Sequence, residues 1–147
     1  MHEALPERFQ SWFDTCGWDV RQHQTEVLER SLEGESVLLV APTGGGKTLA
    51  GFLPSLVELS AAPKNKRSLH TLYISPLKAL AVDIARNLET PVSEMALPVV
   101  VESRTGDTKQ SVRQRQRTEP PDILLTTPEQ VSLLLAHPSA SDLFAGL

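Results

Sequence analysis

The sequence holds a single cysteine, Cys16, among 147 residues. An internal disulfide is therefore excluded, and the chain suits a reducing compartment, which predicts a cytoplasmic protein. No run of 18 or more apolar residues occurs, which argues against a membrane-spanning helix. The start, Met1-His2-Glu3-Ala4, lacks the apolar run of a secretory signal. The content of 40% hydrophobic and 22% charged residues is that of a globular protein, and it excludes a disordered chain or a coiled coil.

The net charge of −4 conceals an uneven distribution along the chain. Residues 1–60 carry nine acids and four bases, residues 61–117 carry five acids and ten bases, and residues 118–147 carry four acids and no base. A basic middle segment is compatible with a phosphate-binding strip, and equally with a solvated face of mixed charge. The charge pattern leaves both interpretations open.

Strand-like and helical segments alternate along the chain. Short apolar runs predict strands at residues 37–40, 69–74, 98–101 and 123–125. Helices are predicted at residues 6–16, 21–33, 47–60, 76–89 and 109–118, and from Thr127 onward. Pro54 should kink or shorten the third of these helices. The alternation predicts an α/β fold in one domain, residues 1–147, with a parallel sheet and helices on both faces. Ligands of such sheets bind at the carboxyl ends of the strands.

A glycine-rich turn, Ala41-Pro42-Thr43-Gly44-Gly45-Gly46-Lys47-Thr48, lies between the first predicted strand and a helix. It fits the P-loop pattern with alanine in place of the first glycine. Glycines let backbone N–H groups surround phosphate oxygens, and the helix N-terminus adds a favourable dipole. Lys47 can neutralise the β- and γ-phosphates, and Thr48 can offer its hydroxyl to Mg²⁺, so both are candidate catalytic residues. The turn predicts a nucleoside triphosphate site, against the alternative of a chance triple-glycine loop.

Further segments occur in a fixed order around this turn. Gly17-Trp18 and Arg21-Gln22-His23-Gln24 precede it, and Ser75–Ala81, Arg104–Thr108 and Thr126–Glu129 follow the later predicted strands. Together they resemble the first RecA-like P-loop NTPase domain of superfamily-two DEAD/DEAH-box helicases. The greatest similarity is to the Lhr-like group and the ligase-associated DEXH-box DNA helicases. The resemblance covers essentially the whole chain.

The resemblance implies a site for ATP and Mg²⁺. Gln24 matches the glutamine that holds the adenine edge, for which an amide offers both a donor and an acceptor. Trp18 is expected on or near the base, with core packing as the alternative, and Gln24 has the alternative of a surface helix glutamine. The implied nucleotide-binding residues are Trp18, Arg21, Gln24, Thr43, Gly44, Gly45, Gly46, Lys47 and Thr48, and Thr48 is the implied metal ligand.

The resemblance also implies contacts to a nucleic-acid backbone. Free N–H groups at a helix start suit a phosphate oxygen, and such contacts carry no base information. Simple helix capping is the alternative, and both roles can hold together. The implied residues are Ser75, Pro76, Leu77 and Lys78, then Arg104, Thr105 and Gly106, then Thr127, Pro128 and Glu129.

Other polar residues are interpreted structurally. The spacing by two of Arg113, Arg115 and Arg117 scatters them around a solvated helix. His23 and His137 lack the spacing of metal ligands, and Cys16 continues an apolar stripe and should be packed.

The resemblance implies parts that do not occur in the sequence. The family pattern continues with a strand bearing an Asp-Glu-x-His motif and with a second RecA-like domain that carries arginine fingers. The chain is therefore expected to be the N-terminal fragment of a helicase ATP-binding domain, with unpaired strand edges and exposed apolar surface.

The resemblance also implies the role of the full-length protein. It is expected to be an ATP-dependent DNA helicase or translocase in DNA repair, acting on single-stranded or partly duplex DNA, with RNA as an alternative and a DNA ligase or nuclease as a partner. Two other functions stay open: a non-catalytic module that binds nucleic acid or a protein partner, and a P-loop kinase.

Overall fold

The computed structural model describes residues 4–42, 44, 46–61 and 67–147, and helices and strands alternate in it between residues 47 and 136. The chain divides into two units, the first formed by Met1–Ala62 with Ser93–Leu97 and the second by Pro63–Val92 with Pro98–Leu147. None of the helices in the described ranges has both the length and the apolar content needed to cross a membrane.

The first unit is helical. It contains α1 (Glu7–Cys16), α2 (Gln22–Leu32) and α3 (Lys47–Ala61), of which α2 and α3 pack against each other. The stripe predicted on α1 is buried at Phe9, Trp12 and Phe13, and Gly17 ends that helix in the left-handed conformation at φ 69°. Helix α3 continues through Pro54, so the expected shortening is wrong. Its buried apolar residues offset the one hydrogen bond that a proline removes.

The strand predicted at residues 37–40 does not form. Residues 35–42 have no regular structure, and the side chains of Leu38 and Val40 are 89% and 85% exposed. A strand needs a hydrogen-bonded neighbour, and no strand in the described ranges pairs with this segment. The apolar composition of residues 37–40 is typical of a buried strand, but composition alone does not show whether a neighbouring strand is present to pair with it.

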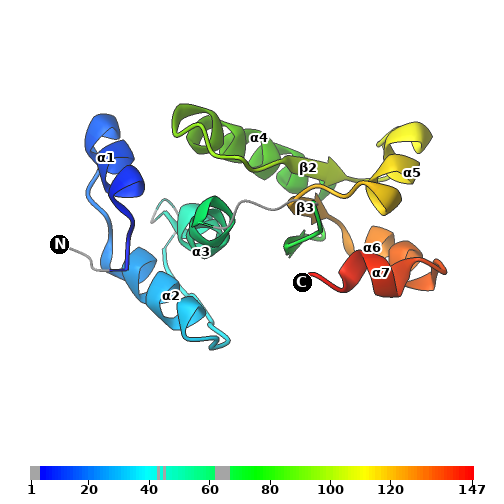
Figure 1. Ribbon diagram of the computed structural model, residues 1–147, viewed down its shortest axis with the longest axis horizontal. Helices are drawn as coiled ribbons and strands as arrows, with labels where there is room; N and C mark the ends of the chain where they lie inside the picture. The colour runs from blue at the N-terminus through cyan, green and yellow to red at the C-terminus, as the bar shows by residue number, and fades with distance from the viewer. Residues whose placement is uncertain (1–3, 43, 45, 62–66) are drawn as a thin grey trace. The chain divides into compact units, whose positions relative to one another are not determined.

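The second unit is built on a parallel sheet. Its strands are β1 (Thr71–Ile74), β2 (Val101–Arg104) and β3 (Ile123–Thr126), in the order β1-β3-β2. The helices are α4 (Lys78–Glu94), α5 (Gln110–Thr118), α6 (Pro128–Ala136) and α7 (Ala140–Phe144). Figure 1 shows α4 on one side of the strands and α6 with α7 on the other. The predicted parallel sheet with helices on both faces is thus present in this unit.

The centre of this sheet is its most buried part. All of β3 is buried, and Leu124 packs with Leu69, Leu134 and Leu143 beneath α6 and α7. Asp122, just before β3, aligns the strand starts, because its carboxylate Oδ2 accepts a hydrogen bond from the Val100 N–H at 2.8 Å.

Several predicted boundaries move. The second and third strands begin at Thr71 and Val101, and the third therefore extends beyond the predicted range to Arg104. Helix α4 begins at Lys78 because the Leu77 N–H first bonds the Ser75 hydroxyl oxygen at 3.3 Å, which forms a turn. Helix α7 occupies the C-terminal segment, where the sequence showed no clear end.

Candidate functional site

The described part of the glycine-rich turn has a backbone conformation that requires glycine. Gly44 and Gly46 have φ of 79° and 75°, a conformation that favours glycine, whereas Thr43 and Gly45 lie outside the described residues. The Ala50 N–H bonds the Gly46 carbonyl at 3.0 Å, so α3 starts directly from the turn. Lys47 and Thr48 are exposed in the first turn of α3. These residues fit a triphosphate with Mg²⁺: Lys47 would meet the phosphates and Thr48 the metal ion.

The amide of Gln24 connects the start of α2 to this turn. Its Oε1 accepts a hydrogen bond from the Arg21 N–H at 2.9 Å, and its Nε2 donates to the Gly46 carbonyl at 3.3 Å. The side chain is 3% exposed, so the alternative of a surface helix glutamine is wrong. Gln24 therefore holds two segments that are 22 residues apart in the chain.

Gly46→Ala is expected to lower the free energy of unfolding of the first unit by about 1–3 kcal/mol. A Cβ at this position would lie 2.7 Å from Gln24 Nε2, and the φ of +75° is strained for alanine. Urea unfolding followed by the fluorescence of Trp12 and Trp18 measures the change.

Gly44→Ala is the matched control for this substitution. Its φ of +79° imposes the same strain, but a Cβ there meets nothing within 4 Å. The excess loss in Gly46→Ala should shrink when Gln24 is also replaced by alanine. Equal losses in the two glycine variants would show that the Gln24 contact does not matter.

Trp18 is not a core residue. Its side chain is 55% exposed, and its ring meets the Trp12 ring edge-on with centroids 5.6 Å apart. Trp12 is fixed in turn by a hydrogen bond from its Nε1 to Glu94 Oε2 at 2.7 Å. Trp18 is therefore in contact with a fixed ring while more than half of its surface stays exposed. Cys16 is only half-buried, less than the packing that its place in the apolar stripe predicted, and burial, followed by the Glu94 charge, raises the pKa of its thiol.

The three strand ends share one pattern of burial. A residue at or near the start of each predicted contact segment after a strand is buried: Ser75, Thr105 and Thr127 are 2%, 3% and 1% exposed, and Arg104, which precedes Thr105, is buried as well. The residue directly after each of the first three is exposed: Pro76, Gly106 and Pro128. In each segment, therefore, a buried residue is followed directly by a residue that solvent or a ligand can reach.

Hydrogen bonds hold these starts together at one edge of the sheet. The Ser75 N–H bonds the Thr126 carbonyl at 3.0 Å, and the Thr126 hydroxyl donates to the Arg104 carbonyl at 2.7 Å. Across the exposed side, Lys78 Nζ forms an ion pair with Asp107 Oδ2 at 2.7 Å, which raises the pKa of Lys78. The structure thus brings the first two contact segments into direct contact.

The third segment opens α6 as the sequence predicts. Pro128 lies at the first helical position, and the Thr127 hydroxyl donates to Glu129 Oε1 at 2.5 Å. This hydrogen bond, with one from the backbone, lowers the pKa of Glu129. Glu129 is exposed and ionised, so it would repel a phosphate that came close to its carboxylate.

Arg104 differs from the exposed residues around it. Its side chain is 3% exposed and donates from Nε to Gln130 Oε1 at 3.3 Å and from Nη1 to the Arg113 carbonyl at 2.9 Å. Burial, followed by the charges of Arg117 and Arg113, lowers the pKa of Arg104 to about 10.

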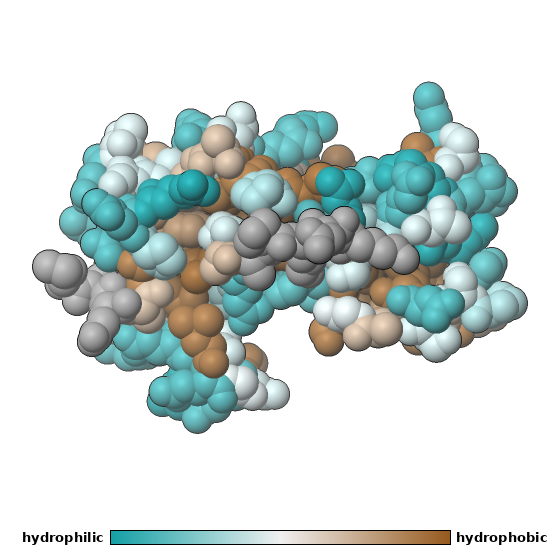
Figure 2. Space-filling model, viewed as in Figure 1, coloured by the Kyte–Doolittle hydropathy of each residue, from teal (hydrophilic) through white to brown (hydrophobic). Residues whose placement is uncertain are grey.

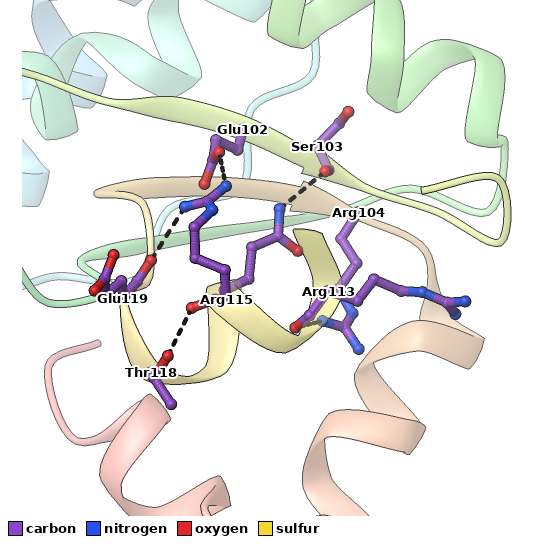
Figure 3. A network of polar contacts seen from close by, with 8 residues as sticks. Glu102, Ser103, Arg104, Arg113, Arg115, Thr118 and Glu119 are labelled. Carbon is purple, nitrogen blue, oxygen red and sulfur yellow. Dashed lines mark hydrogen bonds and ion pairs between the residues drawn. The ribbon is translucent and has the colours of Figure 1, made fainter. Parts of the chain in front are cut away.

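The expectation that the α5 arginines scatter is only partly right. Arg115 turns toward β2 and pairs with Glu102, whereas Arg113 lies with Arg104 at the other side of the helix (Figure 3). Arg113 and Arg117 are four residues apart and therefore share a helix face. The spacing of four residues between Arg113 and Arg117 is the feature of the sequence that predicts this shared face. Arg115, which lies between them, made the three arginines look scattered.

The family model of the DEAD/DEAH box helicase matches residues 21–144, and the chain belongs to that family. The second unit and the P-loop turn are accordingly parts of a RecA-like helicase domain. The structure of helicase MrfA bound to DNA and AMPPNP is similar at a TM-score of 0.86, with 31% identity over 100% of this chain and 20% of that one.

Within the family, Lhr-type helicases are similar in both sequence and structure. The ATP-dependent helicase Lhr-Core of Methanocaldococcus jannaschii is 36% identical over 100% of this chain and 19% of its own length. The structure of Mycobacterium smegmatis helicase Lhr bound to ssDNA and AMP-PNP has a TM-score of 0.85 and 34% identity, over 98% of this chain and 19% of that one. The chain spans about a fifth of the length of these relatives.

Proposed function

We propose that this chain binds ATP with Mg²⁺ at the P-loop and a nucleic-acid backbone at the strand ends, as part of an ATP-dependent DNA helicase or translocase. The observation that carries the nucleotide site is the Gln24 amide, which fixes the start of α2 against Gly46 of the P-loop. Its second Nε2 hydrogen remains for adenine, because one donor meets the Gly46 carbonyl. The relatives named for AMP-PNP support this choice of ligand.

The nucleic-acid site rests on the strand ends. Exposed residues follow a buried anchor at each of the three ends, and backbone N–H groups at such turns favour phosphate oxygens. The structures titled as bound to ssDNA or DNA support DNA as the polymer. A DNA ligase or nuclease partner and a role in DNA repair stay proposals from the resemblance to ligase-associated helicases.

The chain alone is expected to turn over ATP negligibly. No Asp-Glu-x-His sequence occurs in it, and phosphoryl transfer depends on positioning and charge stabilisation by several groups at once. DNA-stimulated hydrolysis by the purified chain, abolished by Lys47→Ala, would contradict this expectation.

The test is equilibrium binding of fluorescent ATP and GTP analogues in the presence of Mg²⁺. The chain should prefer ATP, and Gln24→Ala should remove that preference while leaving a weaker, base-independent affinity. Gln22→Ala is the matched control, because Gln22 is exposed on α2 and bonds only Glu26 in the described contacts. Equal binding of both nucleotides by the unaltered chain would remove the adenine-reading role of Gln24. Salt-sensitive DNA binding with no nucleotide binding would favour the non-catalytic module.

A further inference from the structure

Three arginines of the second unit lie together without an acid. Arg104 ends β2, and Arg113 and Arg117 share the adjoining face of α5. The cluster is tied by the hydrogen bond from Arg104 Nη1 to the Arg113 carbonyl at 2.9 Å. Within the described ranges, none of the three forms an ion pair, and Arg113 Nε is buried without a hydrogen-bond partner.

The other arginine of α5 provides the contrast. Arg115 is paired with Glu102 on the opposite side of the helix, and this pairing raises the pKa of Arg115. Arg104, by contrast, has its pKa lowered by burial and by its two arginine neighbours. A buried cation without a counter-charge is unfavourable, so the cluster would gain from an anion.

The position of the cluster indicates which anion. Arg104 directly precedes Thr105 and Gly106, and its partner Gln130 lies in the first turn of α6, just after Thr127. The cluster therefore adjoins two of the strand ends proposed to meet a nucleic-acid backbone. The surface over α5 is hydrophilic (Figure 2). Arg113 and Arg117 of this helix are both partly exposed. Guanidinium groups bind phosphate oxygens in a bidentate manner, and the adjoining strand ends point to the phosphodiester of a nucleic acid as the anion.

We propose that Arg113 and Arg117, supported from beneath by Arg104, form a phosphate-binding site that extends the nucleic-acid contact from the strand ends onto α5. The inference rests on the proposed function of the strand ends and adds a new element to it. Arg104 acts as a positioning residue, because its hydrogen bonds join β2, α5 and α6 while its own surface is covered.

The experiment measures binding of a fluorescein-labelled single-stranded oligothymidylate by anisotropy over a series of salt concentrations. The double variant Arg113→Gln/Arg117→Gln should bind about tenfold more weakly at low salt, and its plot of log K against log salt should be shallower by about 1.4, as for two lost phosphate contacts. The control is Arg86→Gln/Arg115→Gln, which removes the same charge from residues outside the cluster. Circular dichroism melts of all variants report whether each is folded.

The possible results distinguish a failure of the α5 site from a failure of the proposed nucleic-acid binding at the strand ends. An unaltered chain that binds no oligothymidylate would contradict both. Binding by the unaltered chain with equal losses in the two double variants would overturn the α5 site alone. If the cluster variant does not fold, Arg117→Gln is compared with Arg115→Gln, and equal salt slopes would overturn the inference. Stabilisation by inorganic phosphate that depends on Arg113 and Arg117, without an effect on DNA binding, would assign the site to a free anion instead.

Discussion

Leu124→Ala is expected to lower the free energy of unfolding of the second unit by about 2–5 kcal/mol. Leu124 is 1% exposed on the central strand and packs against Leu69, Leu134 and Leu143. The substitution removes the apolar contacts that Leu124 makes in this cluster and leaves a cavity that rigid neighbours fill only in part. Urea unfolding followed by circular dichroism, together with hydrogen exchange of the β3 amides, measures the loss.

The matched control for this core substitution lies on α6. Leu133 is 58% exposed, so Leu133→Ala removes the same atoms from a site that contacts mainly water. Its effect should stay within about 0.5 kcal/mol. Similar losses in the two variants would mean that the cluster around Leu124 does not hold the unit together. Protection of the β3 amides should fall in the core variant alone, because central strands open only with the unit.

The local features of the fold could be predicted because their causes are local. The stripe on α1, the stop at Gly17 and the Pro128 start of α6 each depend on residues within one or two helical turns. The glycines at 44 and 46 are likewise explained by the positive φ that the turn requires. Such features are readable in the order of residues alone.

The features that could not be predicted from the sequence depend on contacts between residues far apart in the chain. The apolar run at residues 37–40 has the composition of a buried strand, yet pairing is a contact between remote segments and the described chain offers it none. The role of Gln24 likewise needed the structure, since its bond to Gly46 spans 22 residues. Arg104 was expected after a strand but is the last residue of β2, and its burial and its arginine neighbours come from the packing of α5 and α6 against it.

A common principle connects the strand ends with the arginine cluster. At each strand end a buried polar residue forms hydrogen bonds with the residues that follow it, and these bonds hold the adjoining exposed residues in place. The arginine cluster differs from the strand ends, because the buried guanidinium of Arg104 lies beside two further positive charges. Preorganised cations of this kind gain most when an anion arrives, since the protein has already ordered them.

Lys47→Ala is expected to weaken nucleotide binding by about 10- to 100-fold, the range for losing a charged hydrogen bond. Lys47 is exposed at the first position of α3, and no ion pair holds it within the described ranges, so its charge is free for phosphate. The helix N-terminus adds to the same field and would survive the substitution, which is why weak residual binding should remain. Titration with a fluorescent ATP analogue and Mg²⁺ measures the change.

Lys109→Ala is the control for the loss of one positive charge. Lys109 is exposed just before α5, outside the P-loop, so its removal changes the net charge equally without touching the phosphate loop. If the two variants lost affinity alike, the effect would come from the overall field of the protein. A loss confined to Lys47→Ala, together with unchanged ATP-to-GTP preference, would separate the roles within the site. Lys47 would then supply affinity through the phosphates, which both nucleotides share, and Gln24 would supply the choice of base.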